Sequence, residues 1–335
     1  MKMRKILSIL LASLLVLSFA GCKEEKADNT NNTAQQTTQT PEKKDDVVVA
    51  EKDRKIVICW GDSITQGMAM AEGNTYPEQL QAQLGNAYKV INAGVPGENS
   101  STIAARANVI ATVLRNDVTF KKGEAQVRLD RELFIGKNGE DIVLKGFGNK
   151  LPIDNVVVGG NPYTIEFEQG TEKETHFYKL TRTDTSSALT LKKGTDVKFD
   201  YSKYYSGEIY CNIMLLGAND MPAKVNDLLP KYEKIGKAAQ NSIMLIPFYG
   251  DDYAADFTAK FGDKALNLRK YFQTDGAKDV GITLTRSDER AIEKNQAPQS
   301  FAYQNRRGEC HLNEYGYKGM AISIYKKGIE LGYWK

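Results

Sequence analysis

The chain has 335 residues, of which 41% are hydrophobic and 26% charged, so it can form one large domain or two smaller ones. Its formal net charge of +3 comes from the N-terminus, because Lys2, Arg4 and Lys5 precede Cys22 and no acidic residue does. The remainder is neutral, which gives no electrostatic reason to expect nucleic acid or an acidic membrane surface as a ligand.

The N-terminus has the pattern of an export signal. A basic start is followed by an apolar run over 6–20 and then by Gly21 and Cys22. The run is shorter than the about 20 apolar residues of a membrane-spanning helix, although a simple anchor or an ordinary signal peptide is the alternative. The segment resembles the lipobox of bacterial lipoproteins. That resemblance implies cleavage after residue 21 and acyl chains on Cys22, which would hold the chain in the bacterial cell envelope, outside the cytoplasm.

Residues 22–53 follow this predicted lipidation site. They are polar and have almost nothing to bury, which is typical of a disordered tether. Three cysteines remain beyond it, Cys59, Cys211 and Cys310, and three cannot all pair. We therefore expect buried thiols rather than a disulfide framework. No cysteine has metal-ligand spacing and only two histidines are present, so we expect no metal ion and no cofactor.

Apolar strand-like runs then alternate with amphipathic helical runs. We predict strands over 55–60, 89–92, 209–216, 242–248 and, shorter, 265–268. We predict helices over 77–84, 100–114, 223–240 and 314–331, the second of them capped by Ser100 or Ser101. This alternation indicates a mostly parallel sheet that is covered by helices on both faces.

Residues 116–206 differ from the sequence on either side. Short alternating runs over 125–129, 141–144 and 164–168 are separated by turn pairs such as Asn138-Gly139 and Gly159-Gly160, which predicts an all-β insertion. Aromatic faces suit sugar rings, but we expect most of these rings to form the core of the insertion itself. The rings are those of Phe134, Phe147, Tyr163, Phe167, Phe177, Tyr178, Tyr201, Tyr204 and Tyr205.

Three candidate site residues each follow the end of a predicted strand: Ser63, Gly97 and Asn219. In open parallel sheets, ligands bind beyond the carboxyl ends of the strands. Of the two histidines, His176 lies among charges in the insertion and is expected at the surface, whereas His311 precedes the last helix. A hydroxyl, an imidazole and amide donors are the parts of an acyl-transfer site.

Four segments, in chain order, resemble the sequence blocks of the GDSL/SGNH hydrolase family. They are Gly61-Asp62-Ser63-Ile64-Thr65, Asn92-Ala93-Gly94-Val95-Pro96-Gly97, Gly217-Ala218-Asn219-Asp220 and His311-Leu312-Asn313-Glu314-Tyr315-Gly316-Tyr317. The resemblance covers about 54–115 and 207–335, which we interpret as the hydrolase domain. It implies a three-layer α/β/α, flavodoxin-like fold.

The resemblance also implies the hydrolysis of an ester. By position in the blocks, Ser63 would attack the carbonyl and His311 would take its proton. The backbone N–H groups of Ser63 and Gly97 and the side-chain amide of Asn219 would bind the oxyanion, with Gly97 preferred over Gly94 on spacing. Asp62 would have an orienting, structural role beside the nucleophile.

One position departs from the family. An Asp usually stands three residues before the histidine, and here that residue is Gly308. Three interpretations stay open: Glu309 replaces the acid through an altered loop, a backbone carbonyl orients His311, or the protein is catalytically feeble. Asp251 and Asp252 are outside candidates that we interpret as solvated loop acids.

An enzyme anchored outside the cell meets extracellular polymers. We therefore expect the partner to be a small acyl ester or an acylated polysaccharide, with O-acetyl groups as the leading class and no nucleic acid. The alternative is a non-catalytic or weakly active carbohydrate-binding protein on the same scaffold, since a fold does not guarantee a function.

Overall fold

The computed structural model describes residues 50–130, 132–145, 151–169, 176–220, 224–306 and 309–335, without the side chains of Gln169 and His176. The predicted signal peptide, Cys22 and most of the tether lie outside the described residues, as do Phe147 and Gly308. No helix within the described ranges is long and apolar enough to cross a membrane.

The end of the predicted tether is structured, which corrects that prediction. Residues Glu51–Asp53 form a short 3-10 helix. Glu51 pairs with Arg54 at 3.0 Å and with Lys89 at 2.7 Å, so ion pairs that the tether composition did not reveal hold this turn against the domain.

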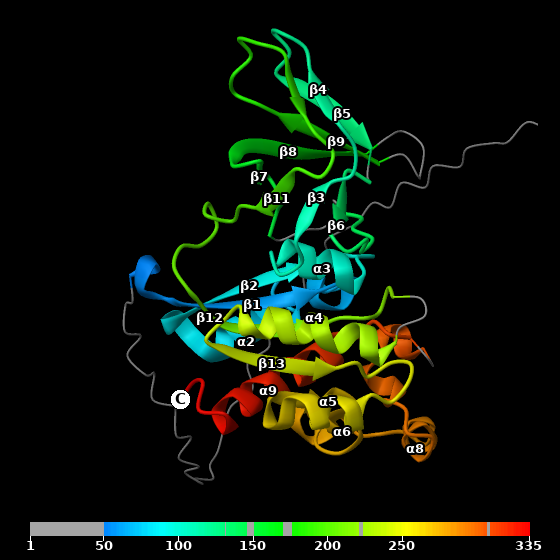
Figure 1. The fold of residues 1–335 in the computed structure, drawn as a ribbon. Coiled ribbons are helices and arrows are strands. Elements are labelled where there is room, and N and C mark those ends of the chain that lie inside the picture. The colour runs from blue at the N-terminus through cyan, green and yellow to red at the C-terminus, as the bar shows by residue number, and fades with distance from the viewer. Residues whose placement is uncertain (1–49, 131, 146–150, 170–175, 221–223, 307–308) are drawn as a thin grey trace, which may run out of the picture. The chain divides into compact units, whose positions relative to one another are not determined.

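A five-stranded parallel sheet forms the centre of the fold, in the order β14-β13-β12-β1-β2 (Figure 1). The strands are β1 (Lys55–Gly61), β2 (Tyr88–Gly94), β12 (Ile209–Leu215), β13 (Asn241–Ile246) and β14 (Ala265–Asn267). Counted along the chain within this sheet, the order is the 2-1-3-4-5 arrangement of flavodoxin-like folds. The predicted α/β class and all five predicted strands are confirmed.

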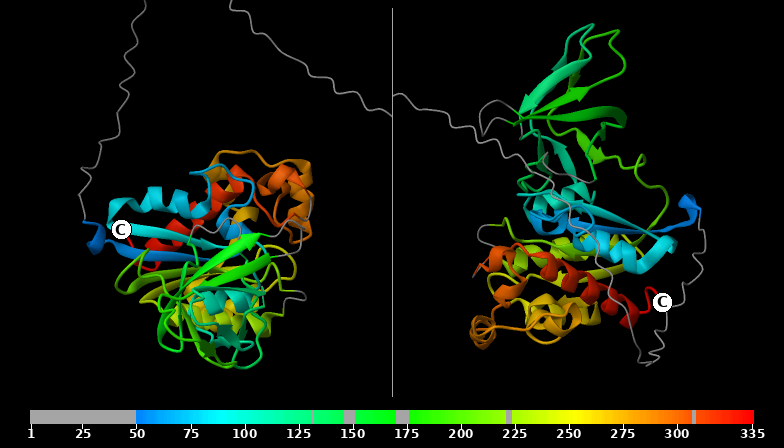
Figure 2. Two further views of the ribbon diagram at one scale, coloured as in Figure 1. Left: turned by 90° about the horizontal axis from the view of Figure 1, so that it is seen from above. Right: turned by 180° about the vertical axis from the view of Figure 1, so that it is seen from behind.

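Helices cover both faces of this sheet. Successive residues of each strand face opposite sides, so each strand contributes side chains to two separate cores. Ile56, Ile58 and Trp60 of β1 belong to one core, and Val57 and Cys59 belong to the other. The first core contains residues of α3 (Ser100–Arg106), α4 (Val225–Lys237) and α5 (Ala254–Phe261). The second contains residues of α2 (Tyr76–Leu84), α6 (Leu268–Gln273), α7 (Gly276–Val280) and α9 (Glu314–Glu330) (Figures 1 and 2).

The helix predicted over 100–114 begins at Ser100 as expected but ends earlier than predicted. Helix α3 ends at Arg106 because Asn108 takes a left-handed φ of 56° and closes the C-terminal turn through bonds to the last carbonyls. Its N-cap is Asn99, whose side chain accepts from the Thr102 N–H, rather than either predicted serine. The sequence reading also missed α5, α6, α7 and α8 (Arg286–Glu293), which are short.

Residues 112–199 contain an antiparallel seven-stranded sheet in the order β5-β9-β8-β7-β11-β3-β6, and a two-stranded ribbon of β10 and β4. The strands are β3 (Thr112–Leu114), β4 (Val118–Phe120), β5 (Gln126–Asp130), β6 (Phe134–Gly136), β7 (Asn155–Val158), β8 (Asn161–Gln169), β9 (His176–Thr181), β10 (Leu189–Leu191) and β11 (Asp196–Phe199). Gly159 and Gly160, with φ of 57° and 86°, form the two-residue turn between β7 and β8. The run 141–144 forms only a bridge at Asp141, which corrects the strand predicted there.

The insertion shares its core with one face of the parallel sheet. Phe120, Phe134 and Phe199 belong to the same cluster as Ile58 and Trp60. Among the described rings of the predicted aromatic set, the buried ones are Phe134, Tyr163, Tyr178 and Tyr201, and the partly buried ones are Phe167, Phe177, Tyr204 and Tyr205. The expectation that most of these rings form core is therefore confirmed.

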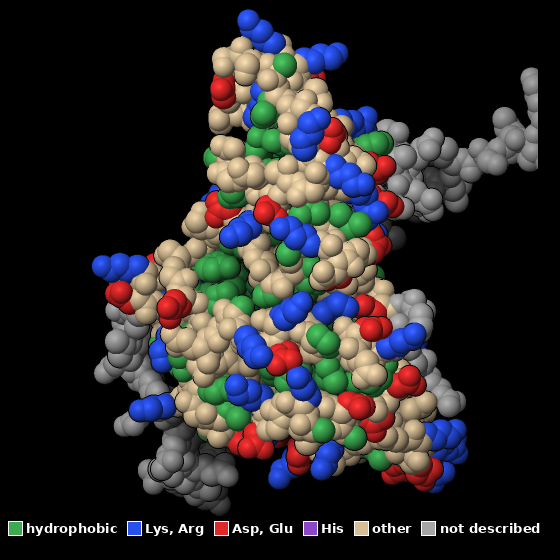
Figure 3. Space-filling view, viewed as in Figure 1, with side chains coloured by type: hydrophobic (Ala, Val, Ile, Leu, Met, Phe, Trp, Pro, Cys, Tyr) green, Lys and Arg blue, Asp and Glu red, His purple; other side chains and the backbone are tan. Residues whose placement is uncertain are grey.

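The described cysteines are free thiols, and the surface carries charges of both signs (Figure 3). Cys59 and Cys211 are buried free thiols, as expected, and Cys310 is a partly buried free thiol. On the face drawn in Figure 3, Lys and Arg side chains are interspersed with Asp and Glu.

Candidate active site

The candidate residues meet at the carboxyl edge of the three central strands. Gly61, at the end of β1, pairs with Gly94 of β2 on one side and with Leu215 of β12 on the other. Ser63 follows two residues later, while Gly97 and Asn219 follow the two flanking strands. The strand order therefore places the Ser63 turn between the turns that carry the two predicted oxyanion donors.

Ser63 opens the short helix α1 (Ser63–Gln66), and Asp62 caps it. The Asp62 carboxylate accepts from the Ile64 N–H at 3.0 Å, and complete burial raises the pKa of Asp62 to about 7. A Cβ on Gly61 would lie 2.0 Å from the Thr65 hydroxyl oxygen, so only glycine lets this turn pack so closely. Asp62 holds the turn that presents Ser63.

A continuous chain of hydrogen bonds links three predicted residues. The Ser63 hydroxyl oxygen lies 2.9 Å from His311 Nε2, and His311 Nδ1 lies 2.8 Å from Glu309 Oε1. The backbone N–H of His311 also donates to Glu309 Oε1, and this bond is the main cause that lowers the pKa of Glu309. A carboxylate at Nδ1 keeps the proton there and leaves Nε2 free to accept one from Ser63.

Solvent reaches this chain of bonds. The side chains of His311 and Glu309 are each 22% exposed, and Ser63 is 7% exposed. Of the three interpretations left open by the sequence, this contact fits the first, in which Glu309 replaces the acid one position later.

The loop that carries His311 is held on both sides. The His311 carbonyl accepts from the Tyr303 N–H, and Leu312 forms a bridge with Ala302. Asn313 then caps α9 by accepting from the Gly316 N–H at 3.0 Å. The imidazole is thus anchored by α9 behind it and by the 302–303 segment beside it.

The N–H group of Gly97 is a free backbone donor. Gly97 is exposed, with a φ of +77°, and no acceptor for its N–H is found among the described residues. The N–H of Gly94, by contrast, donates to the Asn92 side chain at 3.0 Å. This difference favours Gly97 over Gly94 as an oxyanion donor.

Among the residues that the structure describes, the side-chain amide of Asn219 has one hydrogen-bond partner. Its Nδ2 donates to the carbonyl of Glu98 at 3.0 Å, which leaves the second amide hydrogen for a ligand. Ser63 supplies a third donor, since the first N–H of a helix has no partner within that helix.

Two residues near this edge escaped the sequence reading. Glu98 and Arg106 form an ion pair with both side chains fully buried. Glu98 directly follows the second family-like block and Arg106 lies eight residues further on, inside the predicted helix. The sequence signal for this ion pair is two opposite charges at the ends of an otherwise uncharged segment.

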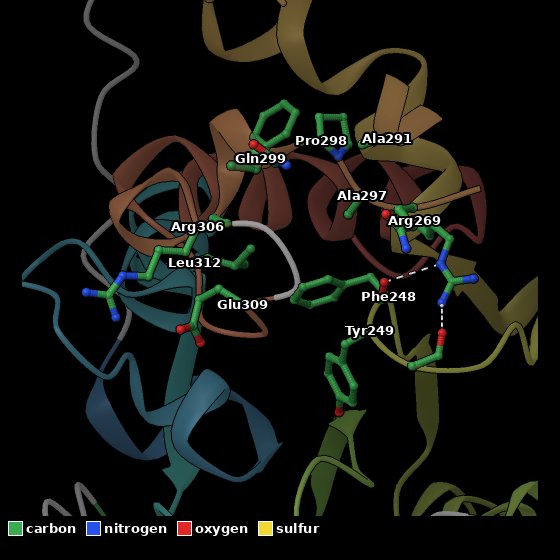
Figure 4. A pocket seen from close by; sticks show the side chains of 14 residues that line it. Phe248, Tyr249, Arg269, Ala291, Ala297, Pro298, Gln299, Arg306, Glu309 and Leu312 are labelled. Atoms are coloured by element: carbon green, nitrogen blue, oxygen red, sulfur yellow. Dashed lines mark hydrogen bonds between the residues drawn. The ribbon is translucent and has the colours of Figure 1, made fainter. Parts of the chain in front are cut away.

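A pocket of about 200 Å³ borders the acid end of the hydrogen-bonded chain (Figure 4). Glu309 and Leu312 line it on one side, and Phe248 and Arg269 line the other. The nearly buried Arg269 donates to the carbonyls of Phe248 and Gly250, as the dashed lines show. The sequence reading did not find this pocket, because its walls come from separate short segments.

The remaining candidates lie elsewhere. The Asp252 carboxylate accepts from the Ala254 N–H and from Asn295, and Asp251 is exposed, which fits loop acids. His176 begins β9, and its side chain lies outside the described residues. Glu309, Cys310 and His311 offer three possible metal-ligand atoms within 4.8 Å of one another, although Glu309 and His311 are hydrogen-bonded to each other.

No protein-family model matches the chain. No curated protein matches it either.

Solved structures give distant matches. A putative lipolytic protein of the G-D-S-L family from Desulfitobacterium hafniense is 9% identical with a TM-score of 0.40, over 82% of this chain and 99% of that one. A carbohydrate acetylesterase family member from Sinorhizobium meliloti is 12% identical with a TM-score of 0.32, over 83% and 99%. The aryl esterase of M. smegmatis is 10% identical with a TM-score of 0.32, also over 83% and 99%. At such low similarity, the functional conclusion depends on the residues of this chain.

Proposed function

We propose that the protein is a serine esterase of the GDSL/SGNH type that hydrolyses acyl esters. The observation that carries the proposal is the hydrogen-bonded series from Ser63 through His311 to Glu309, next to free amide donors on the neighbouring turns. A nucleophile, a base oriented by a third group and preorganised donors are together what acyl transfer requires.

In the proposed reaction, the Ser63 oxygen attacks the ester carbonyl while His311 Nε2 takes the hydroxyl proton. Glu309 keeps the imidazole in the right tautomer and stabilises its cation. The carbonyl oxygen, now negative, accepts hydrogen bonds from the N–H groups of Ser63 and Gly97 and from the Asn219 amide. Collapse of the intermediate expels the alcohol, which takes the proton from His311, and leaves the acyl group on Ser63. Water then gives a proton to His311 and attacks the acyl carbonyl. Collapse of this second intermediate releases the acid and returns the proton to Ser63.

The proposed substrate class is an O-acetyl ester, either a small molecule or an acylated polysaccharide. Gly97 and Asn219 are exposed and the His311 side chain is partly exposed, which suits an ester on a large polymer. The predicted export signal and the lipid on Cys22 would place the enzyme at such polymers, outside the cytoplasm and on a membrane. Mass spectrometry of the N-terminal peptide tests that placement, because lipidation adds acyl mass to Cys22 that a Cys22→Ala chain lacks.

The test of the activity compares the wild type with Ser63→Ala on p-nitrophenyl acetate and on acetylated xylan, pectin and peptidoglycan. We expect kcat/KM for Ser63→Ala to fall by about 10⁴- to 10⁶-fold. Ser202→Ala, which changes an exposed serine of the insertion, is the matched control and should match the wild type. Reaction of a fluorophosphonate with Ser63 alone would identify the nucleophile independently of substrate choice.

The alternative of a carbohydrate-binding protein makes the opposite prediction. It requires a wild type without Ser63-dependent turnover on any of these esters and without fluorophosphonate labelling. Hydrolysis restricted to long acyl chains would instead replace the acetyl proposal with a lipase-like one.

A further inference from the structure

A buried ion pair lies behind the turn that carries the oxyanion donors. Arg106 Nε donates to Glu98 Oε2 at 2.6 Å, and neither side chain is exposed. Arg106 also donates through Nη2 to the carbonyl of Ala93, near the end of β2, at 2.8 Å. Replacing a buried ion pair by apolar residues is often neutral or stabilising, so the presence of the pair is not explained by stability alone.

Glu98 links this pair directly to both proposed donors outside α1. Its backbone N–H donates to the Val95 carbonyl at 3.4 Å, which closes the turn that contains Gly97. Its carbonyl accepts the Asn219 amide at 3.0 Å. One residue therefore closes the turn of the backbone donor and bonds to the side-chain donor.

The insertion contacts Glu98 and also helix α3. The backbone N–H of Lys145 donates to Glu98 Oε1 at 3.2 Å, so both carboxylate oxygens of Glu98 are bonded. The N–H of Val143 donates to the Thr102 hydroxyl of α3 at 3.0 Å. These two bonds attach the segment before residue 146 to the start of the oxyanion turn.

Aromatic rings from the insertion exclude water from the pair. The Tyr201 ring packs edge-on against Trp60 with centroids 6.3 Å apart, and the Arg106 guanidinium lies 5.7 Å from the Trp60 ring. Burial raises the pKa of Tyr178 and of Tyr201, and the charge of Arg106 opposes the rise in both. In such a low-dielectric region, a charged hydrogen bond holds its partners more firmly than it would in water.

We propose that Glu98 and Arg106 are positioning residues for the oxyanion-binding amides of Gly97 and Asn219, and that the β insertion, by enclosing this pair, is a working part of the hydrolytic site. The proposal rests on the esterase function proposed above. It assigns to the insertion a task in the reaction that does not depend on binding a polysaccharide.

The expected effect follows from geometry. Oxyanion donors act when they lie about 2.7–3.1 Å from the developing charge. A shift of about 1 Å at a reacting group can reduce the rate by about 10²-fold. Loss of the ion pair would let Glu98 and its carbonyl move, and both donors would move with it, while His311 and Glu309 would keep their contacts.

The experiment measures kcat and KM for Glu98→Gln, Arg106→Lys and Lys145→Pro on p-nitrophenyl acetate, below the unfolding temperature of each variant. Glu98→Gln keeps an acceptor for the Lys145 N–H but loses the charge. Lys145→Pro removes the backbone donor of the insertion together with the lysine side chain, and Lys145→Ala, which keeps the N–H, is its matched control. We expect kcat to fall about 10- to 100-fold for the first two and less for the third, with KM within about twofold and an unchanged pH profile. In the Asn219→Ala background, Glu98→Gln should slow the reaction by a smaller factor than in the wild type, because only the Gly97 donor is then left to be displaced.

A second substrate separates positioning from a general loss of structure. Sulfur is a weak hydrogen-bond acceptor, so the matching thionoester depends less on the amides, and the ester-to-thionoester rate ratio should fall in the variants. Val156→Ala, which makes a cavity in the core of the insertion, is the control for stability and should keep the wild-type ratio. Variants that keep kcat, or that lose both substrates equally in step with Val156→Ala, would overturn the proposal. A wild type without Ser63-dependent turnover would refute the esterase function itself, which is a different result.

Discussion

The proposed acid–base half of the site lies on a partly exposed loop, whereas the proposed oxyanion half lies beside a fully buried ion pair. Glu309 and His311 are two residues apart, and their contact is local. Glu98 and Asn219 are 121 residues apart in the chain, and the Glu98 carboxylate also bonds to the insertion. One half therefore depends on a short stretch of sequence and the other on the whole tertiary structure.

The two halves differ in whether a group at another sequence position can take over the same contact. A long, partly exposed carboxylate side chain can reach the imidazole from a neighbouring position, which is how Glu309 contacts His311 although residue 308 is glycine. Backbone donors cannot shift in this way, because their direction is set by the peptide itself and by what packs behind it.

The largest effect is expected from Glu309→Gln. An uncharged amide would not hold the tautomer or the imidazolium, so kcat should fall by up to about 10⁴-fold. Glu309→Asp should recover part of the loss, and Glu314→Gln, at an exposed acid on α9, is the control and should match the wild type. Steady-state kinetics on p-nitrophenyl acetate measures this. A loss of less than tenfold for Glu309→Gln would mean that another group orients His311.

The next effect concerns stability. Arg106→Leu leaves the Glu98 carboxylate buried without its charged partner, which should lower the free energy of unfolding by about 3–5 kcal/mol. Lys237→Met, which breaks a surface pair with Glu233, should leave it unchanged within the error of the measurement, because Glu233 also pairs with Lys260. Urea denaturation gives both values. Equal effects would remove the contrast between a buried and an exposed support.

Asn219→Ala tests the proposed oxyanion half without changing either side chain of the ion pair. Loss of one donor should reduce kcat by about 10²–10³-fold with little change in KM. Asn226→Ala, at an exposed position of α4, should have no effect. If kcat stayed within threefold of the wild type, Asn219 would not belong to the oxyanion site.

The smallest effect is the contribution of Glu309 to stability in acid. Its folded-state pKa is lowered below the ordinary 4.5, chiefly by the backbone N–H of His311. A lowered carboxyl pKa stabilises the fold above the unfolded value, and this stabilisation disappears as the pH falls below 4.5 through the folded value. Between pH 6 and pH 3, Glu309→Gln should lose less stability than the wild type, by under about 1 kcal/mol. Identical profiles would show that the hydrogen bond to His311 does not affect folding.

The strands, the parallel α/β class and the sheet edge at which the candidate residues meet could be predicted from the amino-acid sequence. Apolar runs that end in Gly61, Gly94 and Gly217 report buried strands, and parallel strands bring their carboxyl ends to one edge. That is why Ser63, Gly97 and Asn219 could be expected together before any coordinates. His311 could be expected there only through its resemblance to a family block.

The contact that orients His311, the end of α3 and the contacts of the Glu98 carboxylate depend on tertiary packing. Local periodicity extended that helix to residue 114, but Thr112–Leu114 pairs with strands of the insertion instead. Likewise, the burial of Arg106 against Glu98 arises only when the chain folds. Periodicity reports the surroundings of neighbouring residues, whereas these contacts join segments that are distant in the chain and become neighbours only when it folds.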